Sequence, residues 1–162
     1  RKRAVCFRKR FCFSKKNYFK IQVIVYQKKI LIRSKSRGVH IITNKVIDNL
    51  TEIKSIDKGL LYLYLEHTSA SLTINENTDE KVRKDLENYL NKIVPENEPY
   101  FTHTFEGQDD MPAHIKSSLL SNNLTIPITN GALGLGKWQG IFFCEHRNIS
   151  RERIITATMM GV

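Results

Sequence analysis

Acidic, basic and metal-ligating side chains gather in one short stretch of this chain, residues 106–117. The stretch reads Glu-Gly-Gln-Asp-Asp-Met-Pro-Ala-His-Ile-Lys-Ser, and another histidine, His103, lies just upstream. Surface loops seldom combine so many titratable groups of complementary type directly before the start of a helix. Such clusters are where metal sites and acid/base sites are built. The stretch therefore predicts a functional site, without deciding its chemistry.

Three histidines on different predicted elements are the candidate metal ligands. His67 ends a predicted strand, where a side chain can leave the core and enter a cleft; His103 lies in a long loop. His114 follows the predicted start of a helix by one turn. A catalytic zinc or similar divalent ion takes three protein ligands, commonly histidine nitrogens, and keeps one position open for water. We interpret a fourth histidine, His40, as structural because apolar residues flank it.

The carboxylates Glu106, Asp109 and Asp110 are the candidate catalytic residues. Beside a metal they would orient the imidazoles or add oxygen ligands. The residues alone leave three interpretations open: a metal site, a metal-free acid/base or phosphate-binding cleft, and ordinary surface polarity. The expected ion is zinc, or magnesium if the substrate carries a diphosphate.

Hydroxyl groups next to His67 and a lysine on the predicted helix could bind an anion. Thr68 and Ser69 are either hydrogen-bond donors to such a ligand or ordinary strand residues. Lys116 either reaches a phosphate near the helix N-terminus, where free N–H groups favour an anion, or is a solvated lysine. A serine hydrolase is excluded because the chain has no Gly-x-Ser-x-Gly turn between a strand and a helix.

The remaining candidates have structural interpretations. Cys144, within an apolar run, is predicted to be a small buried strand residue rather than a nucleophile. The odd count of three cysteines argues against a disulfide framework and favours a reducing, intracellular compartment, cytoplasmic or organellar. Trp138 is predicted in the core or at a subunit interface. His146 could join the site, but a position at an exposed strand end is the favoured interpretation.

The net charge of +10 comes from one end of the chain. Residues 1–37 contain fourteen Lys and Arg and no acid, so residues 38–162 have 26 − 14 = 12 basic residues against 16 acidic ones, a balance of −4. A nucleic-acid-binding body is therefore not expected, except through a basic arm at residues 1–17. That arm is either a transit-peptide remnant or an exposed tail. No apolar run approaches the roughly 18 residues that span a bilayer, so we expect a soluble protein.

Hydrophobic periodicity predicts a single α+β domain over residues 18–162, with mostly antiparallel strands and about three helices. Residues 18–26 and 30–34, separated by Lys28 and Lys29, predict a hairpin. Further strands are expected at 39–43, 60–65, 70–74, 124–128, 138–144 and 153–160. Helices are expected around residues 46–53, from a capping-box-like Asn77 to Ile93, and from an N-cap at Asp110 to Leu120.

Several motifs together resemble the YjbQ-like family, often labelled secondary thiamine-phosphate synthase. They are His-Thr-Ser-Ala-Ser-Leu at 67–72, Ile-Asn-Glu-Asn at 74–77, the whole of 106–117, Ile-Pro-Ile at 126–128, Trp-Gln-Gly at 138–140, and Glu145. The resemblance covers residues 18–161 in order. It departs at Lys137, where Thr is more usual, and at Ala132, where a basic residue is common.

This resemblance implies a two-sheet β-sandwich assembled as a homotrimer, with sites near the subunit boundaries. It also implies a divalent metal held by histidines, which by position are His67, His103 and His114. Asn75, within a matching stretch, joins Thr68, Ser69 and Lys116 as a predicted ligand-binding residue. The implied activity joins a hydroxymethylpyrimidine diphosphate to a thiazole phosphate, with loss of pyrophosphate.

Three functional hypotheses follow. The first is a metal-assisted enzyme acting on a phosphorylated small metabolite. The second is a non-catalytic trimeric protein that binds a ligand or phosphate, whose stability would rise with ligand without turnover. The third is a nucleic-acid tether through the basic arm, whose binding would fall steeply with salt.

Overall fold

A computed structural model describes residues 22–33, 36–149 and 151–162. The strands are β1 (Ile24–Arg33), β2 (Gly38–Ile41), β3 (Lys58–Leu65), β4 (Ala70–Glu76), β5 (Asn123–Thr129), β6 (Ala132–Leu133), β7 (Gln139–Glu145) and β8 (Glu152–Gly161). The helices are α1 (Thr43–Asn49), α2 (Glu80–Ile93) and α3 (Asp110–Leu120), and a short 3-10 helix, η1, spans Thr51–Ser55. The basic arm at 1–17 lies outside the described residues.

The strands form two antiparallel sheets. The larger has the order β1-β8-β3-β5-β6, and the smaller has the order β2-β7-β4. Alternation of side chains along each strand sends one face of each sheet into a shared core. Leu61, Leu63 and Ile155 enter this core from the larger sheet, and Leu72 and Phe143 enter it from the smaller one. The α+β fold with three helices and two antiparallel sheets is confirmed.

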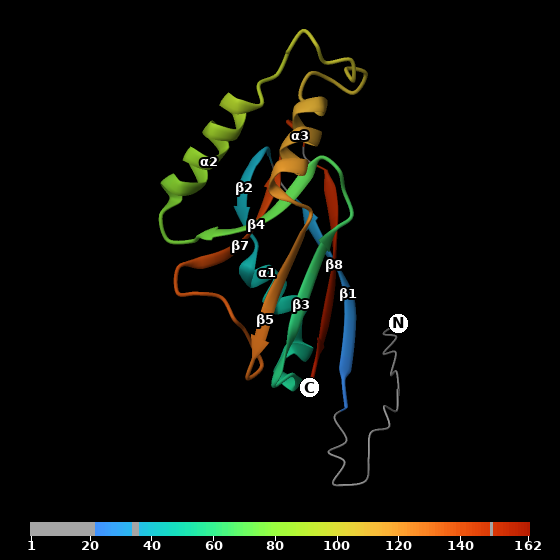
Figure 1. The fold of residues 1–162 in the computed structure, drawn as a ribbon, viewed down its shortest axis with the longest axis vertical. Helices are drawn as coiled ribbons and strands as arrows, with labels where there is room; N and C mark the ends of the chain where they lie inside the picture. The colour runs from blue at the N-terminus through green and yellow to red at the C-terminus, as the bar shows by residue number, and fades with distance from the viewer. Residues whose placement is uncertain (1–21, 34–35, 150) are drawn as a thin grey trace, which may run out of the picture.

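Helices α2 and α3 lie over the smaller sheet, where α2 contacts β2 and α3 contacts β4 (Figure 1). A helix on this face can bury polar groups only where a neighbouring element offers hydrogen-bond partners. Ser117 of α3 shows this, because its hydroxyl donates to the backbone oxygen of Ala70 at 2.7 Å. The helices thus bring α3 and the start of β4 together, which is where the candidate site lies.

Two expected elements differ from the structure. The predicted hairpin in residues 18–34 is wrong over the described part, because β1 is one continuous strand in which Lys28 pairs with Ala157 and Lys29 with Thr156. β1 is an edge strand of the larger sheet, and lysines are common on edge strands, where they discourage pairing with other chains. Residues 18–21 of the expected strand lie outside the described residues.

The first predicted helix is interrupted at Leu50, whose backbone has φ −115° and ψ 53°. The apolar spacing is still correct, since Val46 and Ile53 are buried on either side of the break. The second helix begins two residues later than the capping-box pattern indicated. Asp79, rather than Asn77, is its N-cap and accepts a hydrogen bond from the backbone N–H of Lys81 at 2.8 Å.

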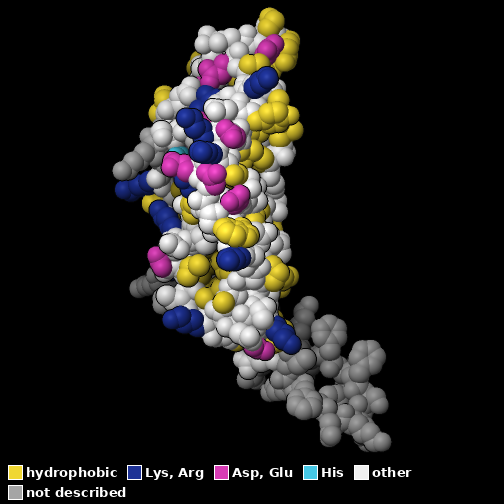
Figure 2. All heavy atoms as spheres, turned by 90° about the vertical axis from the view of Figure 1, so that its left-hand side faces the viewer, with side chains coloured by type: hydrophobic (Ala, Val, Ile, Leu, Met, Phe, Trp, Pro, Cys, Tyr) yellow, Lys and Arg dark blue, Asp and Glu magenta, His cyan; other side chains and the backbone are white. Residues whose placement is uncertain are grey.

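The face that carries α2 has Lys/Arg and Asp/Glu side chains interspersed rather than a basic patch (Figure 2). This mixture agrees with the −4 balance of residues 38–162. Among the described residues, no helix is long and apolar enough to cross a membrane.

Candidate metal site at the start of helix α3

Asp110 is a buried carboxylate at the start of α3, with 2% of its surface exposed. The N-cap position belongs to Asp109, which makes no side-chain capping bond, so the prediction of Asp110 as the N-cap is wrong. Both carboxylates turn instead toward Arg147, which follows β7. Its guanidinium contacts Asp109 Oδ2 at 3.0 Å and also binds Asp110 Oδ1. The helix start is thus fixed by an ion pair from another element.

Arg147 also holds the loop before α3, because its Nη2 donates to the backbone oxygen of Glu106 at 2.7 Å. Burial by itself raises the pKa of Asp109, but the N–H of Asn148 and the Arg147 guanidinium outweigh it and lower the pKa. Asp109 is therefore held as an anion. The predicted catalytic residues Glu106, Asp109 and Asp110 are brought together, and Arg147 is the partner that sequence reasoning missed.

Three potential metal ligands converge beside this ion pair: His103, Asp110 and His114. Each offers one ligand atom, and these atoms all lie within 4.8 Å of one another. His103 Nε2 lies 2.9 Å from Asp110 Oδ2, and His114 Nε2 lies 3.6 Å from Asp110 Oδ1. The two imidazole rings meet edge to face, with their centroids 5.4 Å apart. His103 comes from the long loop and is half exposed, so the group is open on that side.

The hydrogen bonding of His114 determines which of its nitrogens faces Asp110. Its Nδ1 lies 2.9 Å from the backbone oxygen of Thr68, and a carbonyl oxygen can only accept. Nδ1 must therefore carry the proton, which in the neutral ring leaves a lone pair on Nε2. That lone pair faces a carboxylate, an arrangement that needs a proton or a cation between the two groups.

Asp110 Oδ2 is also poorly satisfied. It is buried and has no hydrogen-bond partner among the described residues, because the 2.9 Å contact with His103 is not aligned for a hydrogen bond. Buried carboxylate oxygens are rarely left in this state. An ion between Asp110 and the two imidazoles would satisfy it.

His67 stands apart from this group. Its Nε2 accepts the backbone N–H of Ile154 at 2.9 Å, so the neutral ring carries its proton on Nδ1 and has no free lone pair. Burial, with a smaller contribution from Arg153, lowers the pKa of His67 and favours the neutral ring. The described ligand group thus contains two of the three predicted histidines, and Asp110 in place of the third.

The four predicted ligand-binding residues are not brought together. Thr68 is exposed beside His114, whereas Ser69 is buried and lies 3.2 Å from Nη1 of Arg153. Arg153 makes a buried two-point ion pair with Glu145, at 2.9 and 2.6 Å. Asn75 lies near the far end of β4. The expected phosphorylated ligand stays a prediction.

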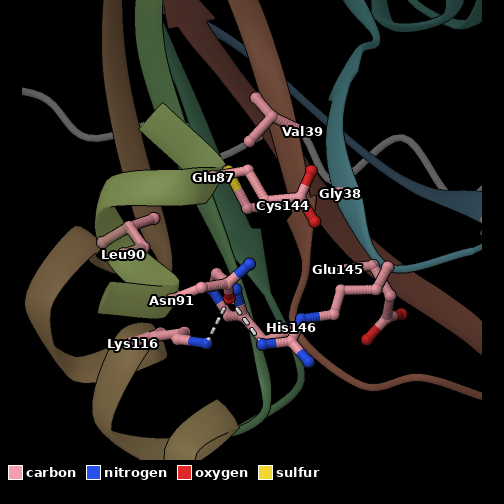
Figure 3. A pocket seen from close by; sticks show the side chains of 10 residues that line it. Gly38, Val39, Glu87, Leu90, Asn91, Lys116, Cys144, Glu145 and His146 are labelled. Atoms are coloured by element: carbon pink, nitrogen blue, oxygen red, sulfur yellow. Dashed lines mark hydrogen bonds between the residues drawn. The ribbon is translucent and has the colours of Figure 1, made fainter. Parts of the chain in front are cut away.

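Lys116 is neither solvated nor near the helix N-terminus. It is 1% exposed on the inner face of α3, and its Nζ donates to Asn91 Oδ1 of α2 at 2.7 Å (Figure 3). Arg37 Nη2 contacts the same oxygen at 2.5 Å. A small cavity of about 10 Å³ adjoins these groups, room for one water. Burial, followed by the charge of Arg37, lowers the pKa of Lys116 to about 8.

His146, expected at an exposed strand end, is buried in the same region, and its Nε2 lies 2.9 Å from the hydroxyl of Ser71. Burial, with the charge of Lys116 next, lowers its pKa to about 3. Cys144 is a buried strand residue, as predicted, and burial raises its pKa to about 12, so it is inert. Trp138 is 56% exposed in the single chain and is not a core residue.

Comparison with known proteins identifies relatives along most of the chain. A family model described as "UPF0047 protein YjbQ-like" matches residues 28–162. The UPF0047 protein YjbQ of Escherichia coli O157:H7 is 46% identical over 136 residues, which cover 84% of this chain and 98% of that protein. Its counterpart in Salmonella typhimurium is 49% identical over the same coverage.

Solved structures share the fold. A Sulfolobus solfataricus protein, described as YbjQ-like and of unknown function, has a TM-score of 0.77 and 22% identity, over 87% of this chain and all of that one. A conserved hypothetical protein of Thermus thermophilus has a TM-score of 0.70 and 32% identity, over 80% of this chain and 97% of that one.

These relatives correct the leading functional hypothesis. They are described as UPF0047 or hypothetical proteins, and the family is an uncharacterised one with no synthase or metal-assisted reaction attached to it. The expectation of a metal-assisted enzyme with thiamine-phosphate synthase-like transferase activity is therefore wrong.

Proposed function

Because this chain belongs to the UPF0047 YjbQ-like family, whose relatives above are described without an activity, we propose a function from the site alone: the protein binds a divalent metal ion through His103, Asp110 and His114. The proposal concerns binding and assigns no reaction. Its support is the geometry at the start of α3.

One observation carries the proposal. The backbone oxygen of Thr68 holds the proton of His114 on Nδ1, so that the lone pair on Nε2 faces Asp110. Histidines that bind metals commonly donate their second ring N–H to a carbonyl or carboxylate, which sets the tautomer and the ring orientation. Thr68 supplies that contact here.

The spacing of the ligand atoms fits a first-row divalent ion. Metal–ligand bonds of about 2.1 Å at angles of 90–109° hold neighbouring ligand atoms about 3.0–3.4 Å apart. His103 Nε2 lies 2.9 Å from Oδ2 of Asp110 and His114 Nε2 lies 3.6 Å from Oδ1, so the two contacts use different oxygens of the carboxylate and lie on either side of that range. Small side-chain adjustments would close the difference.

The donor set favours zinc over magnesium. Two imidazole nitrogens and one carboxylate oxygen suit zinc and similar borderline ions, whereas magnesium prefers oxygen ligands only. Arg147 donates to Oδ1 of Asp110, the oxygen that His114 Nε2 also approaches; this keeps the carboxylate in place but also reduces its negative charge. We therefore expect one zinc-class ion per chain.

The test is zinc titration by calorimetry of chelator-treated full-length protein, with metal content measured on the same samples. The wild-type chain should bind one equivalent. His103→Ala and His114→Ala should each weaken binding by tenfold or more, on the order of the loss that metal ligands and their supporting contacts show. Asp110→Asn, which keeps the shape and removes the charge, should do the same.

His40→Ala is the matched control, because His40 lies on β2 and bonds the backbone oxygen of Ser36 rather than the site. Circular dichroism of every variant separates loss of a ligand from loss of fold. Equal zinc affinity in wild type, His114→Ala and Asp110→Asn would refute the proposal.

We also propose that the chain assembles as a homotrimer through the outer face of its larger sheet. Exposed apolar side chains adjoin there, because Leu60 pairs with Met160 and Met160 pairs with Val25. Tyr62 and Tyr64 continue the row along β3 with stacked rings. Contiguous exposed apolar surface of this kind marks association sites.

Light scattering coupled to size-exclusion chromatography tests the assembly. Wild type should have three times the mass of one chain, and Leu60→Glu should shift it to the monomer. Tyr89→Glu, at an exposed residue of α2, is the matched control and should leave the mass unchanged. A monomeric wild type would refute the assembly while leaving the metal proposal intact.

A further inference from the structure

Two cationic side chains meet at one neutral oxygen between α2, α3 and the smaller sheet. Lys116 Nζ of α3 lies 2.7 Å from Asn91 Oδ1 of α2, and Arg37 Nη2, from the segment before β2, lies 2.5 Å from the same atom. The two nitrogens can be no farther apart than these two distances combined. Like charges this close repel each other, and the charge of Arg37 accordingly adds to burial in lowering the pKa of Lys116.

Only one of these two cations has an anionic partner. Arg37 Nη1 forms an ion pair with Glu96. Lys116 is buried, and in the part of the chain that the structure describes it makes no ion pair and its one hydrogen bond is to Asn91. An ammonium has three N–H donors, so Lys116 keeps donors to spare. Buried charges are normally paired, which makes an anion the group that would complete this site.

The cavity beside Lys116 limits the size of that anion. Its volume of about 10 Å³ holds one water or one small ion. Chloride is only slightly larger than a water molecule, whereas phosphate and sulfate carry four oxygens and are too large. His146 also lines the cavity and is neutral, because burial lowers its pKa to about 3. The side chain of Arg37 is 18% exposed, which gives an ion a route from solvent.

Two carboxylates line the same cavity, and neither contacts Lys116. Both oxygens of Glu145 accept N–H groups of Arg153, at 2.9 and 2.6 Å. Glu87 lies beside Gly38, at the end of the cavity away from Lys116 (Figure 3), and its Oε2 is 3.3 Å from where a Cβ of Gly38 would be. Glu87 therefore opposes an anion from a distance without occupying the position next to Lys116.

From these contacts we infer that the cavity beside Lys116, Arg37 and Asn91 binds a monatomic anion, chloride, which accepts N–H groups from both cations. The ion neutralises the buried ammonium and joins α3 to the segment before β2. The site uses none of the proposed metal ligands and does not depend on them.

Chloride-35 NMR of the full-length protein at pH 7 tests the inference, since Lys116 is then mostly protonated. Chloride is titrated at constant ionic strength with gluconate as the balancing anion. Wild type should give a saturable excess linewidth that bromide abolishes and sulfate does not, because sulfate does not fit the cavity. Crystals soaked in bromide locate the site, and an anomalous peak should lie within hydrogen-bond distance of Lys116 Nζ.

Two variants should move the affinity in opposite directions. Lys116→Met removes the charge and keeps a similar length, and it should weaken chloride binding by about tenfold or more. Glu87→Gln removes the opposing carboxylate and should strengthen binding by about threefold or more. Lys92→Met, which removes an exposed charge of α2, is the matched control and should leave the affinity unchanged. Circular dichroism verifies that each variant is folded.

Four outcomes would overturn the inference. The first is the absence of a saturable excess linewidth in wild type, and the second is equal binding by wild type and Lys116→Met. The third is bromide found only at surface positions. The fourth is weaker binding by Glu87→Gln, which would make Glu87 a supporting group of the cavity instead of an opposing charge.

Discussion

Replacing Lys116 with methionine tests whether the protein carries an unneutralised buried ammonium. The lysine is 1% exposed, and its one hydrogen bond among the described residues is to Asn91. Its pKa falls from 10.5 to about 8. At about 1.4 kcal/mol for each pH unit, this difference corresponds to roughly 3 kcal/mol of folding free energy that the charged form costs.

The direction of this pH dependence follows from whether Lys116 is protonated in the folded and in the unfolded chain. Below about pH 8 the folded and unfolded chains both hold it, so the cost is constant. Between about 8 and 10.5 only the unfolded chain holds it, and the free energy of unfolding rises with pH. Above that window the amine is neutral in both states, and the cost is gone.

Urea unfolding followed by circular dichroism at pH 7, 8.5, 9.5 and 10.5 measures the effect. The stability of Lys116→Met relative to wild type should fall by roughly 3 kcal/mol from the lowest pH to the highest, because only wild type gains stability as its amine is neutralised. Methionine has a similar length, and Asn91 Oδ1 keeps its contact with Arg37, so the substitution leaves that oxygen satisfied.

Lys92→Met, at an exposed position on α2, controls for the loss of one positive charge and should show no such change. Taking differences from wild type also cancels groups common to both proteins, such as Cys144, whose pKa is raised to about 12. A stability difference between Lys116→Met and wild type that is constant from pH 7 to 10.5 would falsify the reasoning.

Three further predictions concern His146, Arg147 and Gly59. The folded-state pKa of His146 is about 3, so between pH 6.5 and 3 only the unfolded chain protonates this ring. Wild type should therefore lose up to about 5 kcal/mol of stability as the pH falls through this window. His146→Asn should flatten the loss in acid-unfolding curves. Arg147→Met should cost about 3–5 kcal/mol in urea unfolding, since it leaves Asp109 and Asp110 buried without their cation; an unchanged midpoint would contradict that role. Gly59→Ala should cost about 1–3 kcal/mol or more in thermal unfolding, because the new Cβ would lie 2.3 Å from the backbone oxygen of Met160.

Elements with regular periodicity could be predicted from the sequence. Residues 60–65 and 153–160 were expected as strands and lie within β3 and β8, and the third helix ends at Leu120 as expected. Errors arose where a tertiary contact overrides local preference. The Lys28-Lys29 pair looks like a turn, but pairing with β8 keeps it extended along the sheet.

The inner face of α3 shows why the buried polar groups were missed. Its buried residues are Asp110, Pro112, Ala113, Lys116 and Ser117, so polar side chains occupy the face that usually carries apolar ones. A hydrophobic pattern cannot indicate such a face. A lysine facing the core differs from a solvated one only through its partners on α2, which are 25 residues away in the sequence.

The sequence by itself determined the family, the α+β class, and the gathering of His103, Asp110 and His114 near one helix start, since these depend on local pattern and short spacing. Only the tertiary structure decided which atoms face one another. Thr68 and Arg147 come from strand ends distant in sequence, and they orient His114 and Asp110 toward a common point. His67 is turned to Ile154 instead, because β8 places a backbone N–H within reach of its ring.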